Sequence, residues 1–232
     1  QTGGISFLAA EGGEEDIRLR GFSLAATGDL FIDGMRDPAF YDRDTFNLDR
    51  VELLRGSASM LFGRGSTGGA VNQVSKVPRL INEHEVTATA GSHAYRRLTG
   101  DFNIHTGEDQ ALRINAMRTT ADNNGAGSRI DKKGLAAAWR VGIGTRDEFM
   151  ASAYWLDNDN GINYGLPWIR PRATDSGAAS TIIGSLAPDA YYGAASDRNS
   201  GGARWLALSH VHRFAGGGEL RVIDGIGNDL PP

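Results

Sequence analysis

Two histidines and a pair of aspartates are the residues of this 232-residue chain whose types and spacing could support metal or acid–base chemistry. His210 and His212 alternate along a strand-like run, so both side chains point to one face, as two ligands of a metal ion would. A pair without a third ligand in view is more often plain surface, so we expect no metal site. Asp157 and Asp159 form the most obvious carboxylate cluster, which a glycan-cleaving β-sheet enzyme would need. Such an enzyme is the third interpretation, after the two given below.

Other catalytic motifs are excluded because the flanking sequence lacks the residues or elements that they require. Residues 63–68, GRGSTG, fit the letters of the dinucleotide-binding motif G-x-G-x-x-G. The stretch that follows is rich in β-branched residues and ends at Pro78, whereas the motif must open a long helix. No phosphate-loop lysine follows these glycines, and no G-x-S-x-G nucleophile motif occurs. We therefore predict no catalytic residues and no enzyme.

The amino-acid composition excludes further classes of site and partner. Cysteine is absent, which excludes disulfides and cysteine-ligated metals, and glycine reaches 32 residues, roughly twice its usual share of about 7%. The net charge of −4 argues against a nucleic-acid partner. No apolar run is long enough for a transmembrane helix, although alternating barrel strands would not give such a run either.

The sequence up to about Pro78 is densely punctuated by glycine and predicts a compact mixed α/β unit. Asp33-Gly34 is a turn dipeptide. Predicted strands cover residues 17–20, 29–32, 51–54 and 70–77, and a short helix covers residues 57–62, with Ser57 as its cap.

From residue 85 onward, apolar and polar side chains alternate. Apolar rows are expected at Leu98 to Ile104, Leu112 to Ala116, Leu135 to Ile143 and Phe149 to Trp155. Tight connections at residues 106–110 and 145–147 alternate with longer ones at 122–131 and 158–200, as in outer-membrane barrels. A soluble β-sandwich gives the same alternation and is slightly favoured on periodicity alone.

Several linked motifs resemble the plug domain of TonB-dependent receptors. They are IRLRGFS (residues 17–23), FIDGMRD (31–37), YDR (41–43) and the long stretch from Leu48 to Arg79. Residues 89–103, 163–172 and 189–202 look like the opening barrel strands and a long outer loop of siderophore receptors, with a leaning towards the catecholate type.

The resemblance implies a β-dominated protein in the outer membrane of a Gram-negative bacterium. Residues 1–78 would form a plug domain without its N-terminal part, and residues 79–232 about seven antiparallel strands of an incomplete barrel of about 22. Its partners would be outer-membrane lipid, a ferric siderophore and the TonB-ExbB-ExbD energy-transducing complex, although the segment that contacts TonB is expected to be missing from this chain. Iron would arrive inside its chelator, so no directly bound cofactor is expected.

With too few strands to close a ring, the chain is expected not to transport alone. The alternative is a soluble β-rich module that binds siderophores without transporting them. If the membrane interpretation is right, Leu98, Phe102, Leu112 and Trp139 face lipid and do not converge on a buried interior.

The resemblance also implies site residues. In the plug, Arg20, Phe22 and Tyr41 would touch the siderophore, because arginine and aromatic rings suit a compact anionic chelate. The long loop would contribute further contacts, or else form an ordinary interfacial aromatic girdle, with Tyr164, Trp168, Arg170, Tyr191 and Tyr192. Contacts between plug and barrel are expected from Glu52, Arg55 and Arg64.

Overall fold

The computed structural model contains strands arranged in four sheets. It describes residues 5–10, 14–19, 22–24, 28–37, 41–55, 69–122, 129–162, 168–169, 181–182, 191, 193–194 and 196–230. The helix predicted over residues 57–62 lies outside these ranges. Within them, no helix is long and apolar enough to span a membrane.

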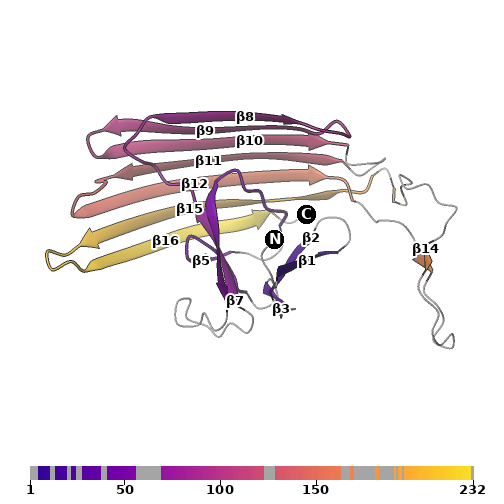
Figure 1. Cartoon of the computed structure of the whole chain (residues 1–232), viewed down its shortest axis with the longest axis horizontal. Coiled ribbons are helices and arrows are strands. Elements are labelled where there is room, and N and C mark those ends of the chain that lie inside the picture. The colour runs from indigo at the N-terminus through magenta and orange to yellow at the C-terminus, as the bar shows by residue number, and fades with distance from the viewer. Residues whose placement is uncertain are drawn as a thin grey trace.

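The largest sheet, here called the wall, is an antiparallel meander of seven strands (Figure 1). Its order is β16-β15-β12-β11-β10-β9-β8, so each strand pairs with its neighbours in the chain. The sequence predicts about seven strands after residue 78, and the wall contains seven among the described residues. The strands are β8 (Glu83–Ala90), β9 (Arg96–Gly107), β10 (Gln110–Ala121), β11 (Ile130–Val141), β12 (Asp147–Asn160), β15 (Asn199–Arg213) and β16 (Glu219–Leu230).

The two ends of the wall differ in the length of their connections. At the turn end, on the left of Figure 1, residues 108–109, 142–146 and 214–218 join neighbouring strands. Residues 91–95, 122–129 and 161–198 connect strands at the opposite, loop end, and the last of these carries the small β13 (Trp168–Ile169) and β14 (Thr181–Ile182) sheet. The predicted alternation of short and longer connections is therefore confirmed from β9 onward, whereas residues 91–95 are no longer than the turns at 142–146 and 214–218.

A four-stranded sheet, here called the plug sheet, lies beside the wall (Figure 1). Its order is β5-β4-β7-β6, with β4 and β7 parallel and the other pairs antiparallel. At the predicted turn, Asp33 and Gly34 have φ angles of 50° and 83°, the two positive values that a type I′ hairpin turn requires. The strands are β4 (Leu30–Ile32), β5 (Met35–Arg36), β6 (Leu48–Arg55) and β7 (Gly69–Ser75).

The first residues form a separate small sheet. It contains β1 (Ile5–Ala10), β2 (Glu14–Leu19) and β3 (Phe22–Ser23). Ile17 of β2 packs against the buried cluster of Leu24, Leu30 and Val71, which ties this sheet to the plug sheet. The predicted strand over residues 70–77 ends earlier, at Ser75, because the chain there leaves the plug sheet towards the wall.

The wall has a polar inward face and an apolar outward face. Asn103, Arg113 and Asn115 point inward and are buried, whereas Leu98 and Trp139 point outward and are 53% and 50% exposed. The outward rows therefore do not converge on a buried interior, which is the arrangement expected for strands facing lipid. A sandwich would have buried these rows, so the slight preference for a sandwich that periodicity alone suggested is wrong.

Candidate functional site at the plug–wall contact

The plug meets the wall through residues 41–47, here called the contact segment, which lead into β6. Asp44 accepts two hydrogen bonds from the Arg97 guanidinium of β9, at 2.8 and 2.7 Å. Asp42 lies 2.6 Å from the Lys132 ammonium of β11 and accepts a 3.0 Å hydrogen bond from Asn160 of β12. Plug carboxylates thus face wall cations, and the two-bond arginine contact fixes orientation as well as distance.

An aromatic stack fills the space beside these ion pairs. The Phe46 ring of the contact segment stacks on Tyr154 of β12 with centroids 5.5 Å apart, and Tyr154 stacks on Trp205 of β15 at 5.3 Å. Gly134 lies beneath Phe46, and a Cβ atom there would come within 2.6 Å of the ring. The wall strand therefore leaves room for a plug side chain where it carries a glycine.

A second contact lies where the chain passes from the plug sheet to the wall. Asp101 of β9 binds both the Lys76 ammonium, at 2.9 Å, and the Arg113 guanidinium, at 2.8 Å. Arg113 also donates to the carbonyl oxygen of Val77 at 3.0 Å, and Arg140 to that of Pro78 at 3.2 Å. The inward side chains of the wall thereby hold the backbone of the connection.

Tyr41 lies in the contact segment, inside a small polar network. Its hydroxyl donates to Asp37 at 3.1 Å, and the Arg43 guanidinium lies 4.4 Å from its ring centroid. Asp37 also accepts hydrogen bonds from Arg43 and from Gln73, each at 2.8 Å. Burial, together with the negative charge of Asp37, holds the pKa of Tyr41 well above its usual value, so the phenol stays neutral.

Most of the other predicted siderophore-binding residues lie outside the described residues or have only their backbone described. Arg20, Tyr164, Arg170 and Tyr192 lie outside the described residues, as does Arg64 of the predicted plug–barrel set. For Phe22, Arg55 and Trp168 only the backbone is described, in β3, β6 and β13. Tyr191 is half-buried in the long connection, and its hydroxyl donates to the Ala194 carbonyl at 3.5 Å.

Glu52, predicted to contact the barrel, is bound within the plug sheet. Its carboxylate accepts a 2.9 Å hydrogen bond from Asn72 of β7 and a 2.7 Å one from Arg50, and these bonds lower its pKa. Sequence reasoning missed the contacts that Asp42 and Asp44 make with Lys132 and Arg97. The polar row of each wall strand could have predicted these contacts. Polar side chains that are buried away from water need polar partners, and here the plug supplies them.

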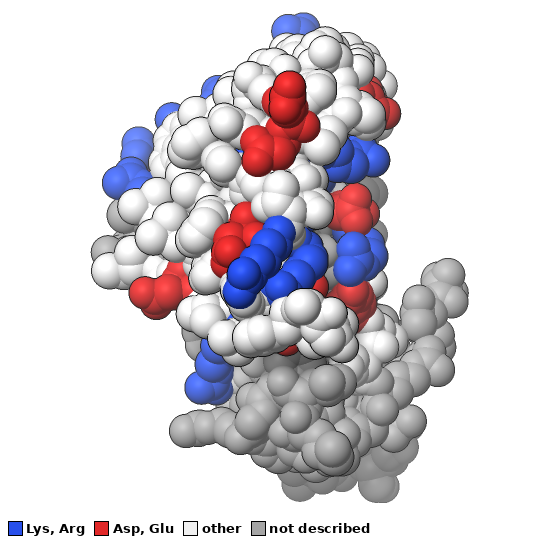
Figure 2. All heavy atoms as spheres, turned by 90° about the vertical axis from the view of Figure 1, so that its left-hand side faces the viewer, with Lys and Arg blue, Asp and Glu red and all other residues white. Residues whose placement is uncertain are grey.

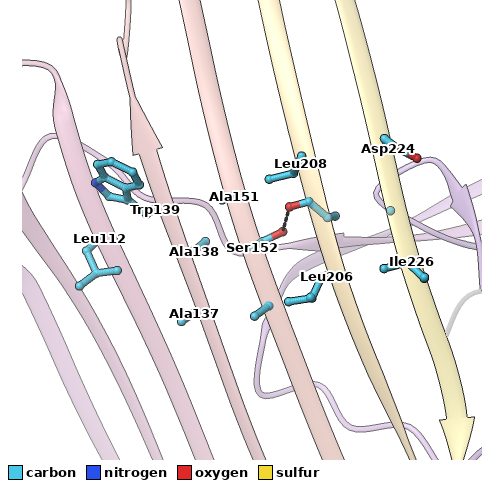
Figure 3. A pocket seen from close by; sticks show the side chains of 13 residues that line it. Leu112, Ala137, Ala138, Trp139, Ala151, Ser152, Leu206, Leu208, Asp224 and Ile226 are labelled. Carbon is cyan, nitrogen blue, oxygen red and sulfur yellow. Dashed lines mark hydrogen bonds between the residues drawn. The ribbon is translucent and has the colours of Figure 1, made fainter.

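Two further polar contacts join the contact segment to the wall: Asn115 of β10 donates to the Asn47 side chain at 3.1 Å, and Asn158 of β12 donates to the Asp42 carbonyl oxygen at 2.8 Å. Figure 2 shows the turn end, where basic and acidic side chains are interspersed without a large patch of one sign. Figure 3 shows a hollow on the outward face among Leu112, Trp139, Leu206, Leu208 and Ile226. The lining is mostly apolar, and its one charged group, Asp224, is itself an anion, so the hollow does not suit an anionic chelate.

A wall whose polar face packs on a plug and whose apolar face is exposed defines the class: part of a plugged β-barrel of the kind whose outer face meets lipid. Comparison with known proteins agrees, because the family described as "TonB-dependent Receptor Plug Domain" matches residues 1–70. By these matches the chain corresponds to the plug and early wall strands of TonB-dependent siderophore receptors, a family of receptors and not of enzymes.

Individual relatives share moderate identity with the chain. It is 35% identical to the probable TonB-dependent receptor BfrD of Bordetella pertussis over 71% of this chain and 23% of that protein. With the catecholate siderophore receptor Fiu of Escherichia coli it shares 29% identity over 83% of this chain and 26% of that protein. The chain therefore spans about a quarter of the length of these relatives.

Solved structures show the same arrangement. The open form of Fiu, the ferric-catecholate import receptor of E. coli, superposes with a TM-score of 0.80 and 26% identity, covering 97% of this chain and 34% of that one. The siderophore receptor PiuA of Acinetobacter baumannii gives a TM-score of 0.84 at 24% identity, covering 97% and 32%. The latter likeness supports the fold alone.

Proposed function

We propose that this chain supplies the plug and part of the wall of an outer-membrane receptor for ferric siderophores of the catecholate type, driven by the TonB-ExbB-ExbD complex. The observation that carries the proposal is the wall itself, whose polar face is bound to a plug while its apolar face is exposed. The name of the relative Fiu supports a catecholate siderophore, and that of PiuA supports a siderophore without naming its type. Iron would remain inside its chelator, so the protein needs no direct ligands to it.

The contacts between plug and wall suit a plug that has to move. The described strands of plug and wall belong to separate sheets, so side chains and loop backbone, not a shared strand ladder, join the two bodies. The pairs Asp44–Arg97 and Asp42–Lys132 retain some solvent exposure at both partners. Water can therefore replace each partner when the pairs separate, at a lower cost than for fully buried ions.

The ligand would be bound at the loop end. We propose Arg20, Phe22 and Tyr41 from the plug and Tyr164, Trp168, Arg170, Tyr191 and Tyr192 from the long connection as its contacts. A guanidinium group can pair with the negative charge of a ferric catecholate, and aromatic rings can cover its flat faces. A neutral Tyr41, held by Asp37, would offer its ring without adding a like charge.

Binding can be measured directly. Ferric tris-catecholate is titrated into the detergent-solubilised chain while tryptophan fluorescence is followed, and Arg20→Ala is compared with Arg50→Ala, an exposed plug arginine paired with Glu52. We expect saturable quenching that weakens at least about tenfold in R20A, the effect of losing a charge-assisted contact of about 1.4 kcal/mol or more, and is unchanged in R50A. Absence of saturable quenching, or equal affinity of both variants, would contradict the proposed site.

Fractionation separates the receptor from the soluble alternative. Cells expressing the chain are divided into outer-membrane and soluble fractions, and siderophore binding is measured in each. A receptor wall should appear in the outer membrane and need detergent for extraction. A monomer that is stable in plain buffer and binds the chelate would instead support the soluble binding module.

A further inference from the structure

Three potential metal ligands meet on the outward face of the wall at its turn end. Asp147 is the first residue of β12 and pairs across the sheet with His212 of β15. His210 lies two residues earlier on the same strand, so its side chain emerges on the same face. The Nε2 atom of His210 lies 3.0 Å from Oδ1 of Asp147, and Nδ1 of His212 lies 2.6 Å from the same oxygen.

The ligand atoms are close enough together to share one ion. One nitrogen from each histidine and a carboxylate oxygen of Asp147 all lie within 4.8 Å of one another. Zinc-type ions bind imidazole nitrogen and carboxylate oxygen at about 2.0–2.2 Å, so small side-chain rotations would place all three atoms around one centre. The arrangement combines two residues of one strand with a cross-strand partner, and all three backbones are fixed by the wall ladder.

Neighbouring aromatic rings hold the histidines in place. His210 stacks on Phe149 with centroids 4.3 Å apart and an interplanar angle of 4°. His212 meets Phe214 edge-on at 4.6 Å. Such packing reduces the rotamer freedom that a ligand set loses on binding, which favours a preorganised site.

The exposure of the three side chains and the charges around them also allow a cation to bind. All three side chains are partly exposed, at the end of the strands where water begins, so an ion can arrive from solution. The next cation along β15, Arg213, is engaged by Glu148 at 3.1 Å and by the Thr145 carbonyl at 2.8 Å. Its charge is thereby partly compensated, and Asp147 supplies the negative charge of the cluster itself.

We propose that Asp147, His210 and His212 form a binding site for a divalent transition-metal ion of the zinc type, with water completing the coordination. Imidazole nitrogen and carboxylate oxygen are donors that such ions accept. On binding, each neutral histidine moves its proton from the coordinating nitrogen to the other ring nitrogen, and an imidazolium would instead release one proton. This site is independent of the proposed siderophore function, and its ion is distinct from the transported iron.

The chain contains a matched control for this proposal. His84 of β8 also points outward and lies beside a phenylalanine, Phe102, with ring centroids 5.8 Å apart. Zn²⁺ is titrated calorimetrically into the detergent-solubilised chain, into His210→Ala, His212→Ala and Asp147→Asn, and into His84→Ala. We expect one ion per chain in the unmodified protein and in H84A. In the other three variants we expect at least tenfold weaker binding, since loss of even an outer-shell partner costs about 10–100-fold.

Two results would overturn the proposal. One is Zn²⁺ affinity that is unchanged in H212A and D147N, and the other is affinity lost equally in H84A. Circular dichroism reports folding, and D147N keeps the size of the side chain. Co²⁺ added to the unmodified chain gives a second measure: nitrogen-ligated Co²⁺ should show visible absorption bands that Zn²⁺ abolishes, whereas the spectrum of the aqueous ion would contradict the site whatever the variants do.

Discussion

The two faces of the wall carry opposite kinds of side chain on the same strands. On β9 and β10, Asp101 and Arg113 point towards the plug and bind each other at 2.8 Å, while Leu98 and Phe102 on β9 point away and are exposed. In a water-soluble sheet the apolar face would be covered and the charged face open. The comparison shows that the wall buries its polar side chains in pairs against the plug, while its exposed apolar side chains suit contact with lipid.

The inward face should be most sensitive at Asp101, because this one carboxylate pairs with two cations. Asp101→Ala leaves Arg113, whose side chain is 8% exposed, and Lys76 without their carboxylate. We expect a loss of about 3–5 kcal/mol in the free energy of unfolding, measured by urea titration in lipid vesicles. The control is Asp131→Ala, which breaks the exposed pair with Arg118 and should cost at most about 1 kcal/mol. Equal losses would show that the inward face is hydrated like a surface.

On the outward face, the loss in free energy of unfolding caused by a new charge should depend on how deep the residue lies in the membrane. Leu206→Arg, near the middle of β15, should cost about 2–4 kcal/mol in the same titration if its side chain meets hydrocarbon. Leu220→Arg, near the turn end of β16, should cost about 0–1 kcal/mol, because charge is tolerated near the membrane boundary. If water covered both sites, both changes would lie within about 0.5 kcal/mol of zero.

The packing of the plug on the wall should be sensitive to added side-chain volume at Gly134. Gly134→Ala places a methyl group within 2.6 Å of the Phe46 ring, which stacks on Tyr154. Overpacking of this kind costs about 1–3 kcal/mol, and it should also speed proteolysis of the contact segment. Gly216→Ala, in a turn with open space around it, is the matched control. Unchanged stability and proteolysis in G134A would show that Phe46 does not occupy this position.

The smallest effect is expected from the ion pair of Asp44 and Arg97. A double-mutant cycle with Asp44→Asn and Arg97→Gln should give a coupling energy of about 1 kcal/mol, because the pair is bidentate but partly solvated. The exposed pair of Arg79 and Glu83 provides the reference cycle, with coupling near zero. Coupling no larger than this reference would exclude a holding role for Asp44.

Period-two alternation and turn residues were sufficient to predict four strands of the wall, β9, β10, β11 and β12. The alternation could not decide whether an apolar row faces lipid or a protein core, because side chains have the same spacing in both cases. The resemblance to plug domains, carried by motifs such as FIDGMRD, decided that question. At Asp33-Gly34 the local sequence was enough, since a type I′ turn depends on two residues alone.

Contacts between distant residues were out of reach. Asp44 precedes its partner Arg97 by 53 residues, and Asp147 precedes His210 by 63. In the sequence Asp44 resembles an ordinary solvated loop carboxylate, and His210 and His212 lack their third ligand. The register of β12 and β15 brings Asp147 to the two histidines, and packing of the contact segment on the wall brings Asp44 to Arg97.

Lipid contact of the outward face can be measured through two tryptophans of the wall. Trp139 points outward on β11, whereas Trp205 of β15 stacks on Tyr154 inside. Two variants, each keeping one of these tryptophans and carrying phenylalanine in place of the other three, are inserted into vesicles of lipids brominated along their acyl chains. We predict strong quenching of Trp139 fluorescence and weak quenching of Trp205. Equal quenching of both, or quenching of Trp205 alone, would contradict a wall whose apolar face meets the bilayer.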